Sequence, residues 1–179
     1  MTLETQKCCT LGNILVLGLG NILLQDEGVG VRVVEMLQAE YEFPSDVVIV
    51  DGGTLGLELL AYVENAERVV IVDAVEMNRT PGALVRLENS AIPAFITQKL
   101  SPHQVGLQDM LALAQLRGQM PRQVVLWGIQ GASFDVSLEL SPVIAAQVPV
   151  LAENVLQELS QWNVAVERIV QSCDSAIVR

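Results

Sequence analysis

The chain has little of several residue types, and each scarcity excludes a kind of site. Its 179 residues include one histidine, His103, and three cysteines. A single histidine excludes mechanisms that need two imidazoles, such as the HExxH zinc site of metalloproteases. Cys8 and Cys9 are adjacent and Cys173 lies near the other end, a spacing that suits neither a disulfide framework nor a zinc cluster. We therefore expect free thiols and no cysteine nucleophile paired with His103.

Basic residues are also few, and long apolar runs are absent. Ten Lys and Arg residues stand against 21 Asp and Glu residues, which gives a formal net charge of -11 and disfavours binding to nucleic acid or to an anionic membrane. No apolar run approaches the roughly 18 residues of a membrane-spanning helix, and the N-terminus lacks the layout of a signal peptide. We expect a cytoplasmic protein whose partner is a metal ion or a basic protein segment.

Hydrophobic residues make up 51% of the chain, enough for one substantial core. We therefore expect residues 1–179 to form a single domain, with an ordered core over about residues 12–165. Residues before about Leu11 and after about Val166 show no clear period, and we expect these ends to be mobile.

Strand-like and helix-like patterns alternate along the chain, which is typical of a largely parallel sheet between two layers of helices. Short apolar runs predict buried strands at residues 13–18, 47–50, 69–72 and 124–127. Residues 83–87 begin too soon after the third strand for a parallel crossover of about a dozen residues, so we expect an antiparallel edge strand there. The predicted fold is a three-layer α/β/α sandwich with a twisted, mostly parallel sheet of five strands.

Apolar residues at helical spacing predict the helices of the two outer layers. The first begins near Glu27 and ends before Pro44, and the last opens at Ser141 and Pro142. Pro149 inside the last pattern implies a kink or a delayed start. Two further helices are marked by the apolar positions Leu57, Leu59, Leu60 and by Leu107, Met110, Leu111, Ala114.

Three carboxylates follow predicted strands, at the sheet edge where open α/β folds place their chemistry. Glu27 follows the first strand, Asp51 ends the second and Asp73 ends the third. Glu27 and Asp73 can converge if the first and third strands are neighbours. Structural roles compete: Asp26 and Glu27 could cap the next helix and interact with its dipole, and Asp51 could anchor a turn. Asp73 directly follows four apolar residues, where a carboxylate is costly unless something pairs with it.

His103 lies in a sequence that reads as the start of a helix. Ser101 is a good N-cap, Pro102 suits the first helical position and Gln104 can close a capping box. The positive end of a helix disfavours the imidazolium, which leaves a neutral ring able to bind a metal. With Glu27 and Asp73, His103 would give three ligands and open coordination positions, a set that accepts several divalent metals.

Five motifs in the chain resemble those of the nickel-iron hydrogenase maturation proteases. The longest, ILVLGLGNILLQDEGVGVR at 14–32, resembles the opening signature of that family. The others follow in the family's order: DGGT at 51–54, VDA at 72–74, PG at 81–82 and SPHQ at 101–104. The resemblance spans roughly residues 14–159 and is specific because several motifs fall in register.

The resemblance implies a five-stranded sheet between helices, with metal ligands at the positions of Glu27, Asp73 and His103, all of which match here. It further implies an endopeptidase, aspartyl-type or metal-dependent, that removes a short C-terminal peptide from the precursor of a [NiFe] hydrogenase large subunit. Nickel would be supplied by that precursor. Each such protease matures its own hydrogenase, so the motifs do not identify the partner.

The residues alone leave the mechanism open. The metal could be a recognition signal in the precursor, completed by the three side chains, or a Lewis acid that polarises the scissile carbonyl or activates water. An aspartic-protease dyad of Asp51 and Asp73 is a third route, although it would leave His103 and Glu27 without a task.

Two other functions remain as alternatives. One is a non-catalytic nickel-binding chaperone that uses the same edge of the sheet only to bind. The other is a dinucleotide-binding α/β module, prompted by Gly18 and Gly20 after a strand. In that motif the third glycine position holds Leu23, and Asp51 lies 51 - 20 = 31 residues after Gly20, where about 20 is usual.

Overall fold

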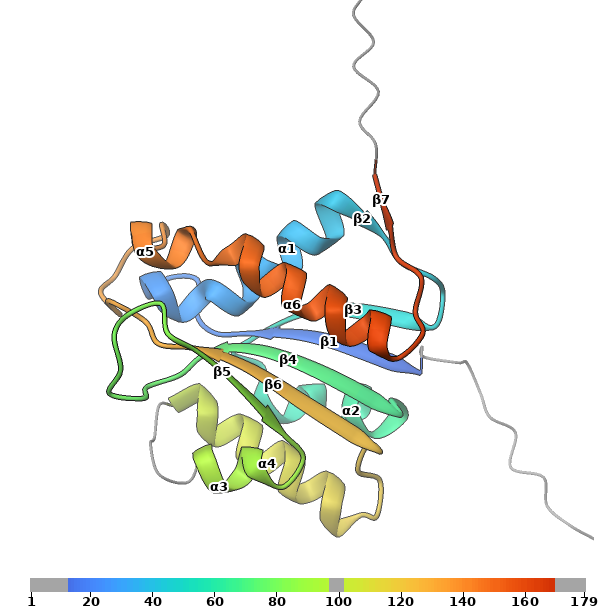
Figure 1. Ribbon diagram of the computed structural model, residues 1–179. Helices are drawn as coiled ribbons and strands as arrows, with labels where there is room; N and C mark the ends of the chain where they lie inside the picture. Colours follow the sequence, from blue (N-terminus) through green and yellow to red (C-terminus); the bar gives the residue numbers. More distant parts are fainter. Residues whose placement is uncertain (1–12, 97–101, 170–179) are drawn as a thin grey trace, which may run out of the picture.

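The computed structural model describes residues 13–96 and 102–169, apart from the side chains of residues 96 and 102–105. The ends expected to be mobile, before about Leu11 and after about Val166, lie outside the described residues except for residues 167–169, of which 167 and 168 form a strand instead. Within the described ranges the chain forms three layers, a sheet with helices on both faces (Figure 1). The predicted α/β/α sandwich is confirmed.

Five strands form the central sheet. They are β1 (Ile14–Leu19), β3 (Val47–Gly53), β4 (Arg68–Ala74), β5 (Leu84–Glu88) and β6 (Gln123–Ile129). Their order across the sheet is β3-β1-β4-β6-β5. The first four are parallel, and β5 pairs antiparallel with β6 at the edge. Strands β1 and β4 are neighbours, which is the condition for Glu27 and Asp73 to converge, and the predicted antiparallel edge strand is confirmed.

Two groups of helices cover the sheet (Figure 1). One face carries α1 (Val29–Glu40), α5 (Pro142–Ala145) and α6 (Val148–Gln161). The other carries the 3₁₀ helix η2 (Gly56–Leu59), α2 (Leu60–Asn65), α3 (Ala91–Ile96) and α4 (Pro102–Leu116). The break between α5 and α6 confirms the delayed start that Pro149 predicts, since the proline falls in the first turn of α6.

The alternating side chains of the strands divide the apolar core in two. In β1, Ile14 and Val16 pack with α1 and α6, whereas Leu15 and Leu17 pack with α2 and α4. Successive side chains of a strand point to opposite faces, so a strand buried on both faces must be apolar throughout. This accounts for the unbroken apolar runs of the sequence.

Several short elements have no strong signal in the sequence. The 3₁₀ helix η1 (Gln25–Gly28) lies directly before α1. Beyond Val166, where the sequence shows no period, β7 (Glu167–Arg168) pairs antiparallel with β2 (Tyr41–Glu42).

None of the helices in the described ranges is long and apolar enough to cross a membrane.

Glycines allow α1 to begin in direct contact with the sheet. A Cβ atom on Gly30 would collide with the carbonyl oxygen of Val72 in β4 and with the backbone of Leu19 in β1. Gly20 has a φ of 120°, and a Cβ there would collide with the carbonyl oxygen of Glu27. The turn from β1 into α1 is therefore closed by backbone-to-backbone contact, which only residues without a side chain permit.

A buried carboxylate ties the last long helix to the antiparallel edge. Glu158 of α6 is 2% exposed and accepts hydrogen bonds from Arg86 Nε at 2.6 Å, Arg86 Nη2 at 3.1 Å and Trp127 Nε1 at 3.3 Å. These bonds join α6 to β5 and β6. The hydrogen bond to Glu158 also raises the pKa of Arg86 above its usual value. The two hydrogen bonds between Arg86 and Glu158 form a bidentate ion pair, which is the strong geometry for an arginine and a carboxylate.

We expect Gly30→Ala to destabilise the fold by at least about 3 kcal/mol, because the new methyl group meets rigid backbone atoms rather than flexible side chains. Gly118→Ala is the control. Gly118 has a φ of 68° with no atom near its missing Cβ, so alanine there should cost only about 1 kcal/mol of backbone strain. Urea unfolding followed by circular dichroism measures both, and equal losses would contradict the packing argument.

We expect Glu158→Ala to lower the free energy of unfolding by about 2 kcal/mol. The loss leaves Trp127 without its acceptor, whereas Arg86 keeps its hydrogen bond to Glu88 Oε2 at 3.0 Å. Glu153→Ala, an exposed position of the same helix, should change stability by less than about 0.5 kcal/mol. The same urea titration compares them, and a near-neutral Glu158→Ala would remove this contact from the stabilising interactions.

Candidate functional site

The candidate site lies where the strand order reverses. From β1 the chain moves outward to β3, then crosses back over β1 to β4. In doubly wound folds such a reversal opens a crevice beyond the carboxyl ends of the two strands, here β1 and β4. The two strongest carboxylate candidates of the sequence, Glu27 and Asp73, follow these two strands.

Glu27 sits in η1, the single turn between β1 and α1, and is 8% exposed. Gly20 allows the carbonyl of Glu27 to lie against the end of β1, and Gly30 brings the start of α1 onto Val72. The turn η1 also packs against β4. The turn that carries Glu27 is therefore fixed beside the end of the strand that carries Asp73.

Asp73 is the second-last residue of β4 and is 1% exposed. It follows Val72, whose carbonyl oxygen meets Gly30, and it pairs in register with Gly128 of β6. A carboxylate this deeply buried requires polar compensation. The structure thus brings Asp73 and the Glu27 turn to the same edge of the sheet, as expected from neighbouring strands.

His103 lies in the first turn of α4, which begins at Pro102 as the sequence predicts. The side chain of His103 and the predicted N-cap Ser101 lie outside the described part of the structure. The backbone of α4 packs closely against η2, the 3₁₀ helix that follows β3. A Cβ on Gly106 of α4 would lie 3.0 Å from the Cα of Gly56 in η2. The start of α4 is therefore placed beside the loop that follows β3.

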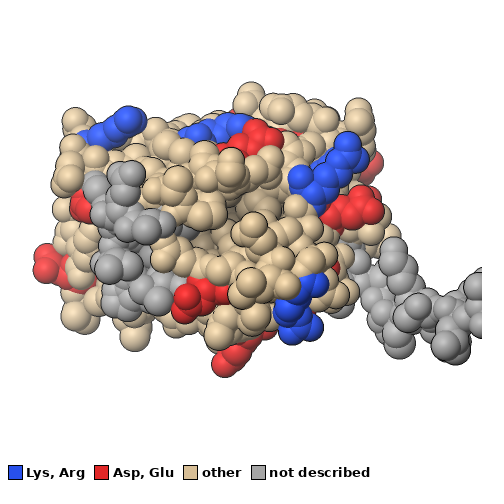
Figure 2. Space-filling view, turned by 90° about the horizontal axis from the view of Figure 1, so that it is seen from below, with Lys and Arg blue, Asp and Glu red and all other residues tan. Residues whose placement is uncertain are grey.

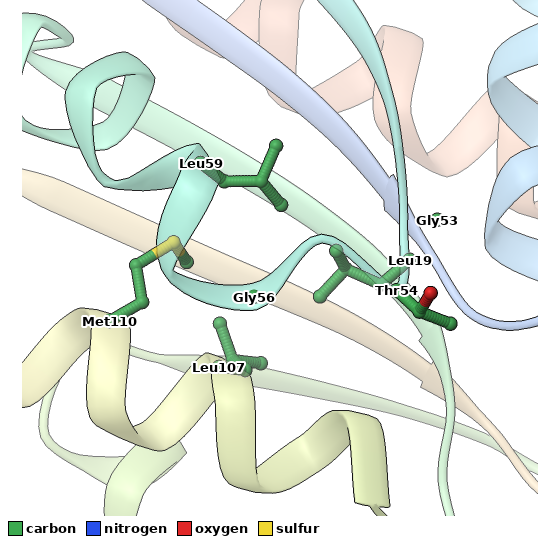
Figure 3. Close-up of a pocket in the computed structure, with 7 residues that line it drawn as sticks. All are labelled: Leu19, Gly53, Thr54, Gly56, Leu59, Leu107 and Met110. Carbon is green, nitrogen blue, oxygen red and sulfur yellow. The ribbon is translucent and has the colours of Figure 1, made fainter.

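A small apolar cavity marks this contact between α4 and the strand ends. Its volume is about 10 Å³, roughly the room for one water molecule. Leu107 and Met110 of α4 line it together with Leu59 of η2 and with Leu19 and Gly53 at the ends of β1 and β3 (Figure 3). The turn of α4 from Leu107 to Met110 thus lines the same cavity as the ends of two parallel strands, and it follows directly on the first turn of the helix.

Asp51 has the structural role that the sequence also allowed. It is exposed, and its Oδ1 atom accepts a hydrogen bond from the backbone N–H of Gly53 at 3.0 Å. Strand β1 separates it from Asp73, because Asp51 pairs with Gly18 and Gly18 pairs with Val72. Two strand spacings are about 9.5 Å. That separation argues against an aspartic-protease dyad, whose carboxylates lie about 3 Å apart.

Asp26 corrects one expectation from the sequence. It does not cap α1, whose N-cap residue is Gly28 and which has no side-chain cap. Instead the buried carboxylate accepts hydrogen bonds from the backbone N–H groups of Ala132, Ser133 and Ser141, at 2.8, 3.0 and 2.7 Å, and from Ser141 Oγ at 2.9 Å. These partners lie more than a hundred residues away along the chain, so no local pattern could have indicated them.

The donor set at this edge suits a divalent metal. Glu27 and Asp73 could supply carboxylate oxygens, and the predicted third ligand, His103, an imidazole nitrogen. The described side chains, which do not include that of His103, contain no cluster of three His, Cys, Asp or Glu residues.

On the described part of the outer surface of the α2, α3 and α4 layer, Lys and Arg side chains lie apart from one another and Asp and Glu side chains lie among them (Figure 2). With the net charge of -11, this arrangement differs from the continuous basic surface that binds nucleic acid.

The family model of the hydrogenase maturation proteases matches residues 31–158. The Hydrogenase 2 maturation protease of Escherichia coli is 41% identical over 152 residues, which cover 84% of this chain and 93% of that protein. The hydrogenase expression/formation protein HupD of Rhodobacter capsulatus is 41% identical over 157 residues, which cover 87% of this chain and 75% of that protein.

Solved structures agree with these relatives. The hydrogenase maturating endopeptidase HybD of E. coli is 39% identical with a TM-score of 0.85, over 87% of this chain and 97% of that one. The [NiFe] hydrogenase maturation protease HycI of Thermococcus kodakarensis is 26% identical with a TM-score of 0.67, over 83% and 92%. Sequence, fold and the reversal point of the sheet lead to one assignment: the chain is a peptide hydrolase that belongs to the hydrogenase maturation protease family.

Proposed function

We propose that this endopeptidase removes a C-terminal peptide from the nickel-loaded precursor of a [NiFe] hydrogenase large subunit, the last step of its maturation in the cytoplasm. The names of its relatives support the substrate class, since they include a Hydrogenase 2 maturation protease and a [NiFe] hydrogenase maturation protease. The proposal rests mainly on one observation: two buried acidic residues, Glu27 and Asp73, follow the neighbouring strands β1 and β4, where the strand order reverses.

In this proposal nickel arrives as part of the substrate. Glu27, Asp73 and His103 complete its coordination, and the scissile peptide next to the metal is thereby held at the sheet edge. One of the carboxylates can also accept a proton from an attacking water and pass it to the amine nitrogen that leaves as the peptide bond breaks. The described residues contain no cysteine, so a water molecule is the simplest nucleophile for them to direct.

Dependence on nickel in the precursor tests the recognition step. Nickel-loaded precursor should be shortened at its C-terminus, and nickel-free precursor should be cleaved at least about 100-fold more slowly, because the docking ligand is missing. Mass spectrometry of the precursor reads the result. Equal cleavage of both forms would contradict metal recognition, and a bound but uncut nickel-loaded precursor would indicate the chaperone alternative.

Substitution of the three predicted ligands tests the site itself. Glu27→Gln, Asp73→Asn and His103→Ala should each lower the processing rate at least about 100-fold, since each removes a ligand charge or a donor atom. Circular dichroism should show that the variants remain folded. The rate is measured on nickel-loaded precursor under single-turnover conditions.

Matched exposed positions serve as controls for these changes. Glu35→Gln in α1 and Asp109→Asn in α4 make the same chemical substitutions on exposed side chains. Both should process the precursor within about twofold of the unsubstituted protein, as expected for surface changes away from the site. Normal processing by any of the three ligand variants would remove that residue from the site.

A further inference from the structure

Residues 130–141, here called the bridging segment, connect the two halves of the candidate site. The segment follows β6 and ends at α5. Leu140, near the end of the segment, packs against the core, but Phe134, Val136 and Leu138 are 41%, 87% and 60% exposed. Polar contacts therefore fix most of its path, since apolar burial supplies little before Leu140.

One end of the contact network is Asp26, next to Glu27. Its carboxylate is 0% exposed and accepts the four hydrogen bonds from Ala132, Ser133 and Ser141 described above. Backbone bonds extend this contact, with the N–H of Gln25 donating to the carbonyl of Ser137 at 2.9 Å. The turn that carries Glu27 is thus bonded to three separate points of the bridging segment.

The other end is Gln130, which reaches the loop after Asp73. Gln130 is 4% exposed, and its Oε1 atom accepts hydrogen bonds from the backbone N–H groups of Met77 at 2.6 Å and Arg79 at 3.3 Å. The backbone N–H of Gly82 also donates to the carbonyl of Gln130 at 2.8 Å. The loop after β4 is therefore bonded to the same segment that Asp26 binds.

We propose that Asp26 is a positioning residue of the peptidase: it bonds the Glu27 turn to the bridging segment, whose Gln130 bonds the loop after Asp73, and so sets where the two carboxylates stand relative to each other. Asp26 itself contacts neither metal nor substrate. The proposal rests on the proposed function of Glu27 and Asp73.

The chemistry of the contact identifies the informative substitutions. All four groups around the Asp26 carboxylate can donate, so Asp26→Asn keeps its shape but turns an amide NH₂ toward a donor. Ser141→Ala removes only the hydroxyl and leaves the other three bonds. The series Asp26→Asn and Ser141→Ala therefore weakens the same contact by two different amounts.

Two controls separate positioning from stability. Asp135→Asn makes the same substitution in the same segment on an exposed side chain whose partner is Ser133 Oγ. Leu159→Ala creates a cavity under α6 at the end of the sheet remote from Asp73. Leu159 lies near Trp162, and the carbonyl of Trp162 accepts a hydrogen bond from Arg68, the first residue of β4. This variant loses stability without touching the candidate edge.

The experiment measures, for every variant, the melting temperature, the affinity for Ni²⁺ alone by calorimetry, and the single-turnover rate on saturating nickel-loaded precursor well below melting. Asp26→Asn should weaken Ni²⁺ binding and slow cleavage by about 10-fold, the lower end of the cost of losing a group that orients a metal ligand, because Asp26 acts through the backbone of the Glu27 turn. Ser141→Ala should show smaller losses in both. Asp135→Asn and Leu159→Ala should keep both within about twofold, although Leu159→Ala melts earlier.

Folded Asp26→Asn with unchanged Ni²⁺ affinity and cleavage rate would overturn the proposal, and so would equal losses in Leu159→Ala. If Asp26→Asn does not fold, Ser141→Ala decides in the same way. Failure of the proposed function looks different, because the unsubstituted protein would then leave the precursor uncut or Glu27→Gln would still cleave it.

Discussion

The contact of α1 with the two central strands is the constraint on which the candidate site depends. Gly30 lies against the carbonyl of Val72 and the backbone of Leu19, so no side chain separates the helix from the sheet there. The turn η1 is continuous with α1, and Asp73 directly follows Val72. One backbone contact thereby fixes both acidic positions, because a shift of the helix would carry Glu27 away from β4.

Buried polar side chains then fix what apolar packing leaves loose. Apolar burial is non-directional and holds the helices on the sheet, but it does not select a path for an exposed loop. Asp26 and Gln130 select that path for residues 130–141, and Glu158 fixes the edge strands to α6. A buried acceptor surrounded by donors is specific because any other arrangement leaves polar groups unsatisfied. The fold thus combines an apolar core with directional hydrogen bonds at three buried side chains, Asp26, Gln130 and Glu158.

Elements with strong periodic patterns could be predicted from the sequence, and the weaker ones could not. The β1, β4 and β6 runs are apolar on both faces and were recognisable by composition alone. The short helix α3 contains Pro93, which looks like a helix breaker but lies in the first turn, where a backbone N–H has no partner within the helix. Strand β7 depends on pairing with β2, more than a hundred residues earlier, which no local pattern carries.

The sequence by itself determined the fold class, the family, and the positions of Glu27 and Asp73 after their strands, because periodicity and motif order are local properties of the chain. The tertiary structure decided how the rest is used. It assigned Asp51 to a turn and Asp26 to a buried contact with residues 132, 133 and 141. Both are aspartates in similar local sequence. Their roles differ because the folded chain brings different hydrogen-bond donors to each carboxylate.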